Sequence, residues 1–392
     1  MLEHTAEPTC GATERSPLVT GRAIPRAVFP LDPTLLERIA GRAVAADRGE
    51  RDLAGDVAEL ARAGALAAVL PVREGGLALG HDGDPLVLAS ALRALGAANL
   101  SVARLFEGHV NAAKLVALYG DAAARERVWG VVAGGGLLGV WGAEGDPPLA
   151  LGEDGTLRGG KRFASGLGLV GLAVVSIAKD DGVRLALVDA SEPKRGDASG
   201  WHVTGMRATA SGTFDATGLR PLSMLGEAND YLREPFFEGG TWRYCAAHLG
   251  GAEALFQEVL RRLRRSGRAD DPHQRDRIAG MATACETARL WIESAALRVE
   301  NGPSDPEGAA AYALLAREAT ERACLEVIDL TERALGMLAH AETTPIARMR
   351  RDLSMFLRQA GPDAKRMRAA AALVARGCSA EGLGRAAARS SS

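Results

Sequence analysis

The hydrophobic period changes twice along this 392-residue chain, and that change constrains the fold more than any other feature. Over residues 33–136 apolar residues recur at helical spacing, as in the amphipathic segment 52–71, and Thr34 to Glu37 form a predicted capping box. Over residues 137–225 the period becomes two, in short apolar runs separated by Gly, Asp and Pro. From residue 231 onward the helical period returns. The chain is therefore expected to form helices, then strands, then helices again.

This succession predicts an α+β fold that is mainly α. We expect an N-terminal α-helical domain over residues 31–136, a small antiparallel β-barrel or sandwich over 137–228 and a C-terminal four-helix bundle over 229–378. The Pro-, Thr- and Arg-rich segment 1–30 and the tail 379–392, rich in Ala, Arg and Ser, are expected to be disordered.

Composition argues against several classes of protein. The formal net charge of −2 lacks the positive excess that is typical of nucleic-acid-binding proteins. The longest apolar run, about residues 166–178, is too short and too rich in glycine to span a bilayer. The five cysteines are far apart, odd in number and form no CxxC pair, so neither a disulfide framework nor a zinc site is expected. These features favour a cytoplasmic protein without a bound metal, in a reducing compartment.

The stretch RMRRDLSMFLRQAGPD (348–363) is a predicted basic helix that stops at a turn. Gly361 tolerates left-handed dihedral angles and Pro362 cannot continue the helical hydrogen bonding, so both residues end the helix for ordinary reasons. The turn carries no acid, because Gln359 and Ala360 occupy the positions where the chain reverses.

Several segments, in order along the chain, resemble acyl-CoA dehydrogenases. They are ELARAGALAAVLPVREGG (59–76), WGAEGDPP (141–148), GGKRFASG (159–166), GMRATASGTFDATGLRP (205–221), HQRDRIAGMATACETARLWIESAALRVENG (273–302) and RALGMLAHAETTPIARMRRDL (333–353). The resemblance is collinear over about residues 32–375. It implies a flavoprotein that holds FAD between the β domain and the bundle and removes two hydrogens from an acyl thioester such as an acyl-CoA. It also implies a homodimer or homotetramer and a possible electron-transfer partner. The flavin would carry the redox chemistry, and the protein would position the reactants.

The resemblance implies that four residues lie around the flavin ring. Phe163 would flank the isoalloxazine and Ser165 would form a hydrogen bond near N5. Trp141 and Gly142 lie in the other flavin-contacting segment, in which Gly142 stands at or near the place of a usual threonine. For Phe163 and Ser165, a buried aromatic residue and a turn serine remain the ordinary alternatives.

The resemblance places the pyrophosphate of FAD on a bundle arginine of one subunit and a glycine-rich turn of its neighbour. The implied residues are Arg264 or Arg265, Gln274, Arg333 and Gly336. The turn is eroded, since other residues replace its further glycines at positions 337 and 339. A run of arginines is also common on a solvated helix face, which is the alternative for Arg264 and Arg265.

The usual catalytic glutamate has no counterpart here, because the resemblance places it at Ala360. A second place used by some members, just before Arg243, holds Trp242. Abstraction of an α proton needs a positioned base. The remaining candidates are Glu238, Glu107 and His109, and the resemblance places Glu107 at the floor of the acyl cavity. A helix-start acid explains Glu238 equally well, and a structural network explains Glu107 and His109.

Three hypotheses about function therefore remain open. The first is an FAD-dependent dehydrogenase of an acyl thioester with a displaced or absent base. The second is a flavin-dependent monooxygenase of the same fold, in which reduced flavin and oxygen act and no base for an α proton is needed. The third is a degenerate member that keeps the fold as a binding or scaffold protein.

Overall fold

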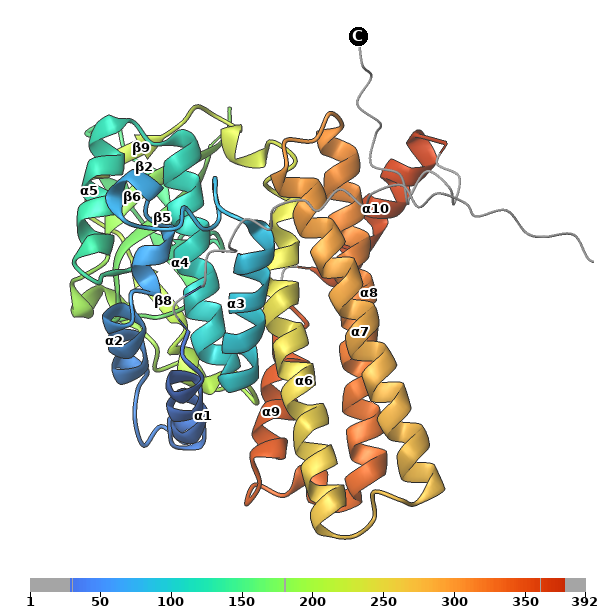
Figure 1. The fold of residues 1–392 in the computed structure, drawn as a ribbon. Coiled ribbons are helices and arrows are strands. Elements are labelled where there is room, and N and C mark those ends of the chain that lie inside the picture. The colour runs from blue at the N-terminus through green and yellow to red at the C-terminus, as the bar shows by residue number, and fades with distance from the viewer. Residues whose placement is uncertain (1–28, 30, 180, 360, 378–392) are drawn as a thin grey trace, which may run out of the picture.

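The computed structural model describes residues 29, 31–179, 181–359 and 361–377 and shows the three units expected from the sequence (Figure 1). The segments expected to be disordered, 1–30 and 379–392, lie outside the described part of the chain except for residue 29. Ala360 also lies outside it. In Figure 1 the N-terminal helices and the strands form one lobe, and the helices of the C-terminal bundle stand beside it. The predicted fold class, α+β and mainly α, is confirmed.

The N-terminal unit consists of short helices that pack against the strands and the bundle. They are α1 (Pro33–Asp47), α2 (Ala54–Arg62), η1 (Leu66–Val69), η2 (Val72–Glu74), α3 (Pro85–Ala98), α4 (Leu100–Tyr119) and α5 (Ala122–Ala133). The predicted capping box is wrong in detail, because Asp32 is the N-cap of α1 and its carboxylate accepts from Thr34 N at 2.9 Å. The predicted helix over 52–71 is also shorter, since α2 ends before Gly64, whose φ is +75°.

The β unit contains three small sheets. Its strands are β1 (Leu137–Trp141), β2 (Ala150–Leu151), β3 (Leu157–Arg158), β4 (Gly160–Ala164), β5 (Val170–Lys179), β6 (Gly182–Asp189), β7 (Gly196–Asp197), β8 (Gly212–Asp215) and β9 (Ser223–Leu225), with 3₁₀ turns η3 (Pro193–Arg195) and η4 (Arg207–Thr209). The sheets have the orders β1-β5-β6-β9, β2-β3 and β4-β8-β7. The expectation of a wholly antiparallel unit needs one correction, because β1 and β5 are parallel. The chain between them runs through the other two sheets, and such a crossover connects parallel strands.

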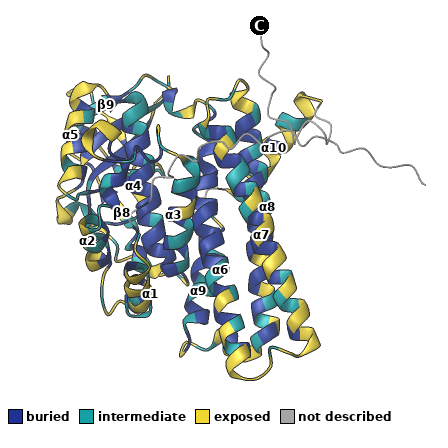
Figure 2. Cartoon of the chain, in the orientation of Figure 1, coloured by how far each residue is buried: buried dark blue, intermediate teal, exposed yellow. Residues whose placement is uncertain are grey.

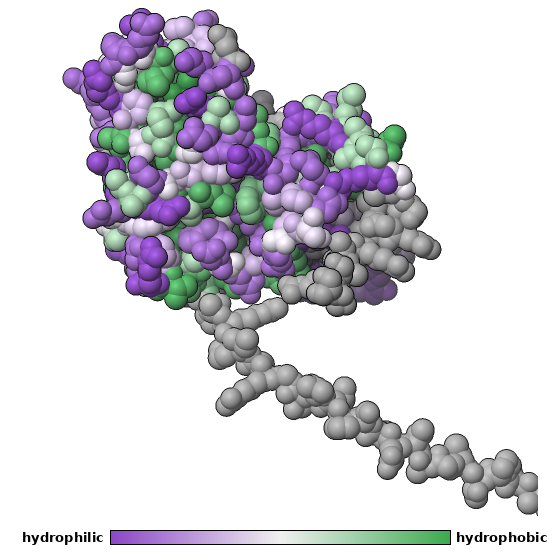
Figure 3. All heavy atoms as spheres, turned by 90° about the horizontal axis from the view of Figure 1, so that it is seen from above, coloured by the Kyte–Doolittle hydropathy of each residue, from purple (hydrophilic) through white to green (hydrophobic). Residues whose placement is uncertain are grey.

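The bundle consists of long helices with short connections. Its elements are η5 (Asp230–Leu232), η6 (Gly239–Thr241), α6 (Trp242–Arg265), α7 (Pro272–Glu300), α8 (Pro306–Leu335), η7 (Gly336–His340), α9 (Pro345–Phe356) and α10 (Pro362–Ala375). Figure 2 shows that α6 is buried along its upper part, whereas the lower ends of α7 and α8 carry many exposed residues. On the face seen in Figure 3, hydrophilic residues are interspersed with smaller hydrophobic areas. None of the described helices is long and apolar enough to cross a membrane.

Two glycines let the N-terminal unit approach the bundle backbone to backbone. A Cβ at Gly96 of α3 would lie 2.2 Å from the carbonyl oxygen of Ala247 in α6. A Cβ at Gly250 of α6 would lie 2.0 Å from the carbonyl oxygen of Arg93 in α3. Any side chain at either position would push the two helices apart, so this crossing requires glycine on both sides.

The β unit is tied to the bundle by a buried carboxylate. Asp352 of α9 accepts from the backbone N–H of Met206 at 2.7 Å and from Arg348 Nη1 at 2.9 Å. Both charged side chains are almost fully buried. Burial raises the pKa of Asp352, and the positive charge of Arg348 opposes this effect. The loop before η4 therefore docks on α9 through a charged contact that excludes water.

We predict that Asp352→Ala lowers the free energy of unfolding by about 3–5 kcal/mol, because it leaves the Arg348 guanidinium buried without its anion. Urea denaturation followed by circular dichroism measures this loss. Asp329→Ala is the matched control, since Asp329 forms an exposed i,i+4 pair with Arg333 at 2.7 Å and its loss should have little effect. Equal effects of the two substitutions would contradict the role of Asp352.

Candidate active site

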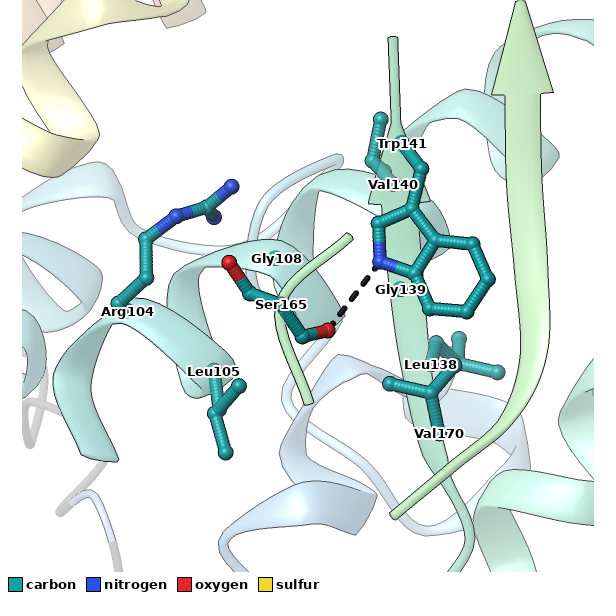
Figure 4. A pocket seen from close by; sticks show the side chains of 9 residues that line it. All are labelled: Arg104, Leu105, Gly108, Leu138, Gly139, Val140, Trp141, Ser165 and Val170. Carbon is teal, nitrogen blue, oxygen red and sulfur yellow. Dashed lines mark hydrogen bonds between the residues drawn. The ribbon is translucent and has the colours of Figure 1, made fainter. Parts of the chain in front are cut away.

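A small pocket in the described part of the chain lies between α4 and the strands of the β unit (Figure 4). It is lined by Arg104, Leu105, Gly108, Leu138, Gly139, Val140, Trp141, Ser165 and Val170. Two residues that the sequence assigned to the flavin ring, Trp141 and Ser165, thus come together here. Trp141 Nε1 donates to the carbonyl oxygen of Ser165 at 3.1 Å, which joins the end of β1 to the residue after β4.

Phe163 is exposed next to this pocket in an unusual backbone conformation. Its side chain is 58 % exposed and its φ is +54°. Non-glycine residues seldom adopt this left-handed region, and here it accompanies a break in the β4–β8 register between Lys161 and Ala164. The bulge turns the Phe163 ring outward instead of into the core. The ring lies edge-on to Trp201, with the centroids 6.3 Å apart. No pattern in the sequence pointed to Trp201.

A chain of hydroxyl groups supports Ser165 from below. Ser211 Oγ lies 2.9 Å from both Ser165 Oγ and Thr209 Oγ1. Thr209 in turn donates to the carbonyl oxygen of Met206 at 2.8 Å. Each hydroxyl has one proton, so the chain is fully hydrogen-bonded only when all three protons are used within it. The chain therefore fixes the position of Ser165 at the wall of the pocket.

Gly142 lies on the loop that follows β1 and is held in place by a buried lysine. Its carbonyl oxygen accepts from Ser176 Oγ at 3.1 Å. Lys161, with an exposure of only 1 %, donates to Ser176 Oγ at 3.1 Å and forms an ion pair with Glu144 at 2.7 Å. Burial lowers the pKa of Lys161, and Glu144 opposes that shift. The backbone of this loop is therefore fixed by charge pairing.

The residues that the sequence assigned to the pyrophosphate lie at the end of the bundle where α6 and α8 end and α7 begins. Arg264 and Arg265 end α6, Gln274 lies in the first turn of α7, Arg333 in the last turn of α8, and Gly336 begins η7. The Gln274 side chain is buried and lies 3.3 Å from the carbonyl oxygen of Ala334. No described contact links these residues to Phe163 or Ser165 of the same chain. The two predicted halves of the flavin site are therefore separate within one molecule.

Glu107 lies in a buried network of polar and charged side chains that connects α4 to the bundle. Its carboxylate accepts from Arg104 Nη1 at 2.5 Å and from the Asn111 amide. Asn111 Oδ1 accepts from Arg243 Nε of α6 at 2.6 Å. Glu300 of α7 then accepts from Arg243, from Trp242 Nε1 at 3.1 Å and from Lys114. Both carboxylate oxygens of Glu107 are thus engaged.

Burial shifts the basicity of the lysine at the far end of this network. The pKa of Lys114 falls to about 8, first because the ammonium is desolvated, while the adjacent Glu300 carboxylate opposes the change. Arg104 stands at the other end and is the member of the network that lines the pocket. The network therefore reaches from the pocket wall to the centre of the bundle.

His109 connects three elements through both of its ring nitrogens. Nε2 lies 2.9 Å from the carbonyl oxygen of Leu66 in η1, and Nδ1 accepts from the N–H of Leu138 in β1 at 3.1 Å. This pattern requires a neutral ring with its proton on Nε2. Complete burial lowers the pKa of His109 to about 4, so the neutral form persists at ordinary pH. A catalytic role would require His109 to give up one of these contacts.

Glu238 lies before α6 and is fully paired. Its carboxylate forms ion pairs with Lys365 and Arg368, both on α10. Its backbone N–H donates to Glu234 at 3.0 Å, and burial raises the pKa of Glu234 to about 7. Glu238 therefore anchors α10 to the start of α6. The position of the missing family acid, Ala360, lies outside the described residues.

We predict that His109 makes the fold acid-sensitive, because its pKa is lower in the folded chain than in the unfolded chain. Below the unfolded value the unfolded chain binds a proton that the folded chain refuses, so stability is lost as the pH falls toward the folded value. Between about pH 7.5 and about pH 5 the wild type should lose about 2 kcal/mol more than His109→Gln. Urea denaturation at both pH values measures the difference. Parallel pH dependences of the two proteins would contradict this role.

Comparisons with known proteins agree on the architecture. Residues 233–375 match the family model described as the acyl-CoA dehydrogenase C-terminal domain. No curated protein matches the chain by sequence. Among solved structures, FMN-bound TdsC from Paenibacillus sp. A11-2, a dibenzothiophene monooxygenase, superposes with a TM-score of 0.75 at 18% identity, over 88% of this chain and 96% of its own.

Two further structures are similar over comparable lengths. Butyryl-CoA dehydrogenase from Megasphaera elsdenii has a TM-score of 0.73 at 20% identity, over 87% of this chain and 96% of its own. KijD3, in complex with FMN and a dTDP-linked amino-keto sugar, has a TM-score of 0.75 at 20% identity, over 94% of this chain and 97% of its own. At identities this low, the structural similarity establishes a common fold and nothing more specific. The predicted resemblance is thus confirmed: the chain has the acyl-CoA dehydrogenase fold, and residues 233–375 match that family's C-terminal domain.

Proposed function

We propose that the protein is a flavin-dependent oxidoreductase that binds the flavin ring against Phe163, Ser165 and Trp141. The observation that carries the proposal is the Phe163 side chain, an exposed aromatic ring held outward by a left-handed bulge next to a pocket. Aromatic rings stack favourably on flat conjugated systems, and the Ser165 hydroxyl lies at the wall of the same pocket. The flavin, when bound, supplies two-electron transfer, and the protein supplies orientation and the exclusion of water.

The choice between FAD and FMN depends on the residues that the sequence assigned to the pyrophosphate. The side chains of Arg264 and Arg265 form no ion pair with any described residue, and guanidinium groups suit phosphate. Since these residues are separate from Phe163 within one molecule, they would serve an FAD held by a second copy of the chain. We therefore propose FAD and at least a homodimer. FMN, which is bound in the TdsC and KijD3 structures, lacks the adenylate half and would not need this group.

The first candidate reaction is the α,β-dehydrogenation of an acyl thioester, with an electron-transfer partner as acceptor. It follows from the collinear resemblance to the family and agrees with the similarity to butyryl-CoA dehydrogenase. The reaction needs a carboxylate that takes the α proton. Glu107 is one hydrogen bond away from the pocket-lining Arg104, as His109 is from the pocket-lining Leu138, but of these two only Glu107 is a carboxylate. It could act only after releasing Arg104 or Asn111.

A specific observation favours a second candidate, a flavin-dependent monooxygenase. Glu107, His109 and Glu238 are all engaged by partners in the described part of the chain. A reaction of reduced flavin with oxygen needs no base for an α proton, so these paired side chains are no obstacle to it. The TdsC structure shows that this fold also serves a monooxygenase.

We predict that purified protein is yellow and that Phe163→Ala weakens flavin binding roughly fivefold to tenfold, the loss of about 1 kcal/mol of stacking. Flavin absorbance after gel filtration measures retention, and chromatography of the released cofactor distinguishes FAD from FMN. Leu232→Ala is the control, because Leu232 is also partly exposed but lies in η5, away from the pocket. Colourless preparations that ignore both added flavins would refute the flavin proposal and favour a scaffold protein.

The two reactions separate with the Glu107→Gln variant under defined oxygen conditions. For a dehydrogenase, we expect a panel of acyl-CoAs to bleach the flavin of the wild type without oxygen, and Glu107→Gln to slow bleaching roughly a hundredfold or more. For a monooxygenase, we expect no bleaching by acyl-CoAs, and oxygen uptake by the reduced protein that Glu107→Gln leaves unchanged. Rapid anaerobic bleaching in both proteins would exclude Glu107 as the base.

A further inference from the structure

We infer that Arg104 binds an oxyanion group of the substrate, a carboxylate or a phosphate, in the pocket between α4 and β1. The inference rests on the proposed function only for the position of the flavin ring, which would lie beside this pocket at Phe163 and Ser165. It assigns to Arg104 a role that the sequence did not indicate. From the sequence, only Glu107 and His109 in this helix were candidate site residues.

Arg104 has unused hydrogen-bond donors at the wall of the pocket. Its side chain is 17% exposed, and Nη1 donates to Glu107 at 2.5 Å. Its Nε and Nη2 have no partner among the described residues. These donors belong to one planar group, which suits an oxyanion with two oxygens. Glu107 holds the guanidinium from one side, so a ligand would meet an oriented donor and not a freely rotating chain.

The Ser165 hydroxyl lies at the wall of the same pocket. Figure 4 shows this hydroxyl turned toward the side of the pocket on which Arg104 lies. An oxyanion in this space would therefore lie close to both the Arg104 guanidinium and the Ser165 hydroxyl.

The rest of the pocket indicates what the anionic group is attached to. Leu105, Leu138, Val140 and Val170 line the same space with apolar side chains. An apolar body would contact these residues while its oxyanion meets Arg104 and Ser165. The substrate class is therefore a small acid or phosphate ester with an apolar part, held by its charged end.

The experiment titrates the full-length protein with benzoate, with phenyl phosphate and with the uncharged benzamide, and isothermal titration calorimetry measures the binding. Flavin content is recorded first from the absorbance band. We expect benzoate or phenyl phosphate to bind saturably and benzamide roughly tenfold or more weakly, because only the anions engage the guanidinium. Tighter binding of benzoate would assign a carboxylate, and tighter binding of phenyl phosphate would assign a phosphate ester.

The variant removes both charges, since Arg104→Gln alone would leave the Glu107 carboxylate buried without its cation. The double substitution Arg104→Gln, Glu107→Gln should weaken anion binding roughly tenfold or more. Arg104→Lys keeps the charge without the planar guanidinium, so its affinity for the anions should lie between those of the wild type and the double variant. Arg62→Gln, on the exposed surface of α2, is the control and should bind as the wild type does.

Equal binding of benzoate and benzamide, or undiminished benzoate binding by the double variant, would overturn the assignment of Arg104. These results do not depend on flavin. A yellow protein without anion binding would refute this inference alone. A colourless protein that binds benzoate through Arg104 would refute the flavin proposal and leave the oxyanion site in place.

Discussion

The buried charge network along α4 is the interaction on which the arrangement of the three units depends. Four of its members lie at helical spacing on one helix, at positions 104, 107, 111 and 114, so they share a face. That face contacts Arg243 of α6 and Glu300 of α7, while His109, on another face, contacts η1 and β1. Water is excluded from these contacts, so each charge needs its partner. One helix thereby sets how the β unit, the N-terminal helices and the bundle meet.

The same network shapes what the pocket can bind. A helix face that carries charged side chains cannot form the wholly apolar wall that a long acyl chain prefers. Residues that would be free bases in isolation are engaged here as structural partners, because a buried carboxylate or imidazole is stable only with hydrogen bonds. Positions outside the network are different. Phe163 is largely exposed and Arg104 keeps spare donors, and these features support the two proposed ligand contacts.

Local rules predicted the existence of most elements and failed where tertiary contacts decide. The helical period over residues 33–136 predicted helices in the region where α3 and α4 lie. Asp32 caps α1 instead of Thr34, because both residues are good caps and only the chain path decides between them. The parallel pairing of β1 with β5 was not predictable, since period-two runs carry no information about strand direction. The contact between Asn111 and Arg243 was equally hidden, because these two residues lie 132 positions apart along the chain.

The sequence by itself determined the order of helices, strands and helices, the family resemblance and the absence of an acid at position 360, because these are properties of residue type and local spacing. It also placed Phe163 and Ser165 in one segment that, by its resemblance, is predicted to contact flavin. Only the tertiary structure decided that Phe163 points outward, that both ring nitrogens of His109 contact backbone groups, and that the residues predicted to bind the flavin ring and those predicted to bind the pyrophosphate are separate within one molecule. The physical reason is that exposure, hydrogen bonding and charge pairing depend on residues far apart in the chain, which local patterns do not encode.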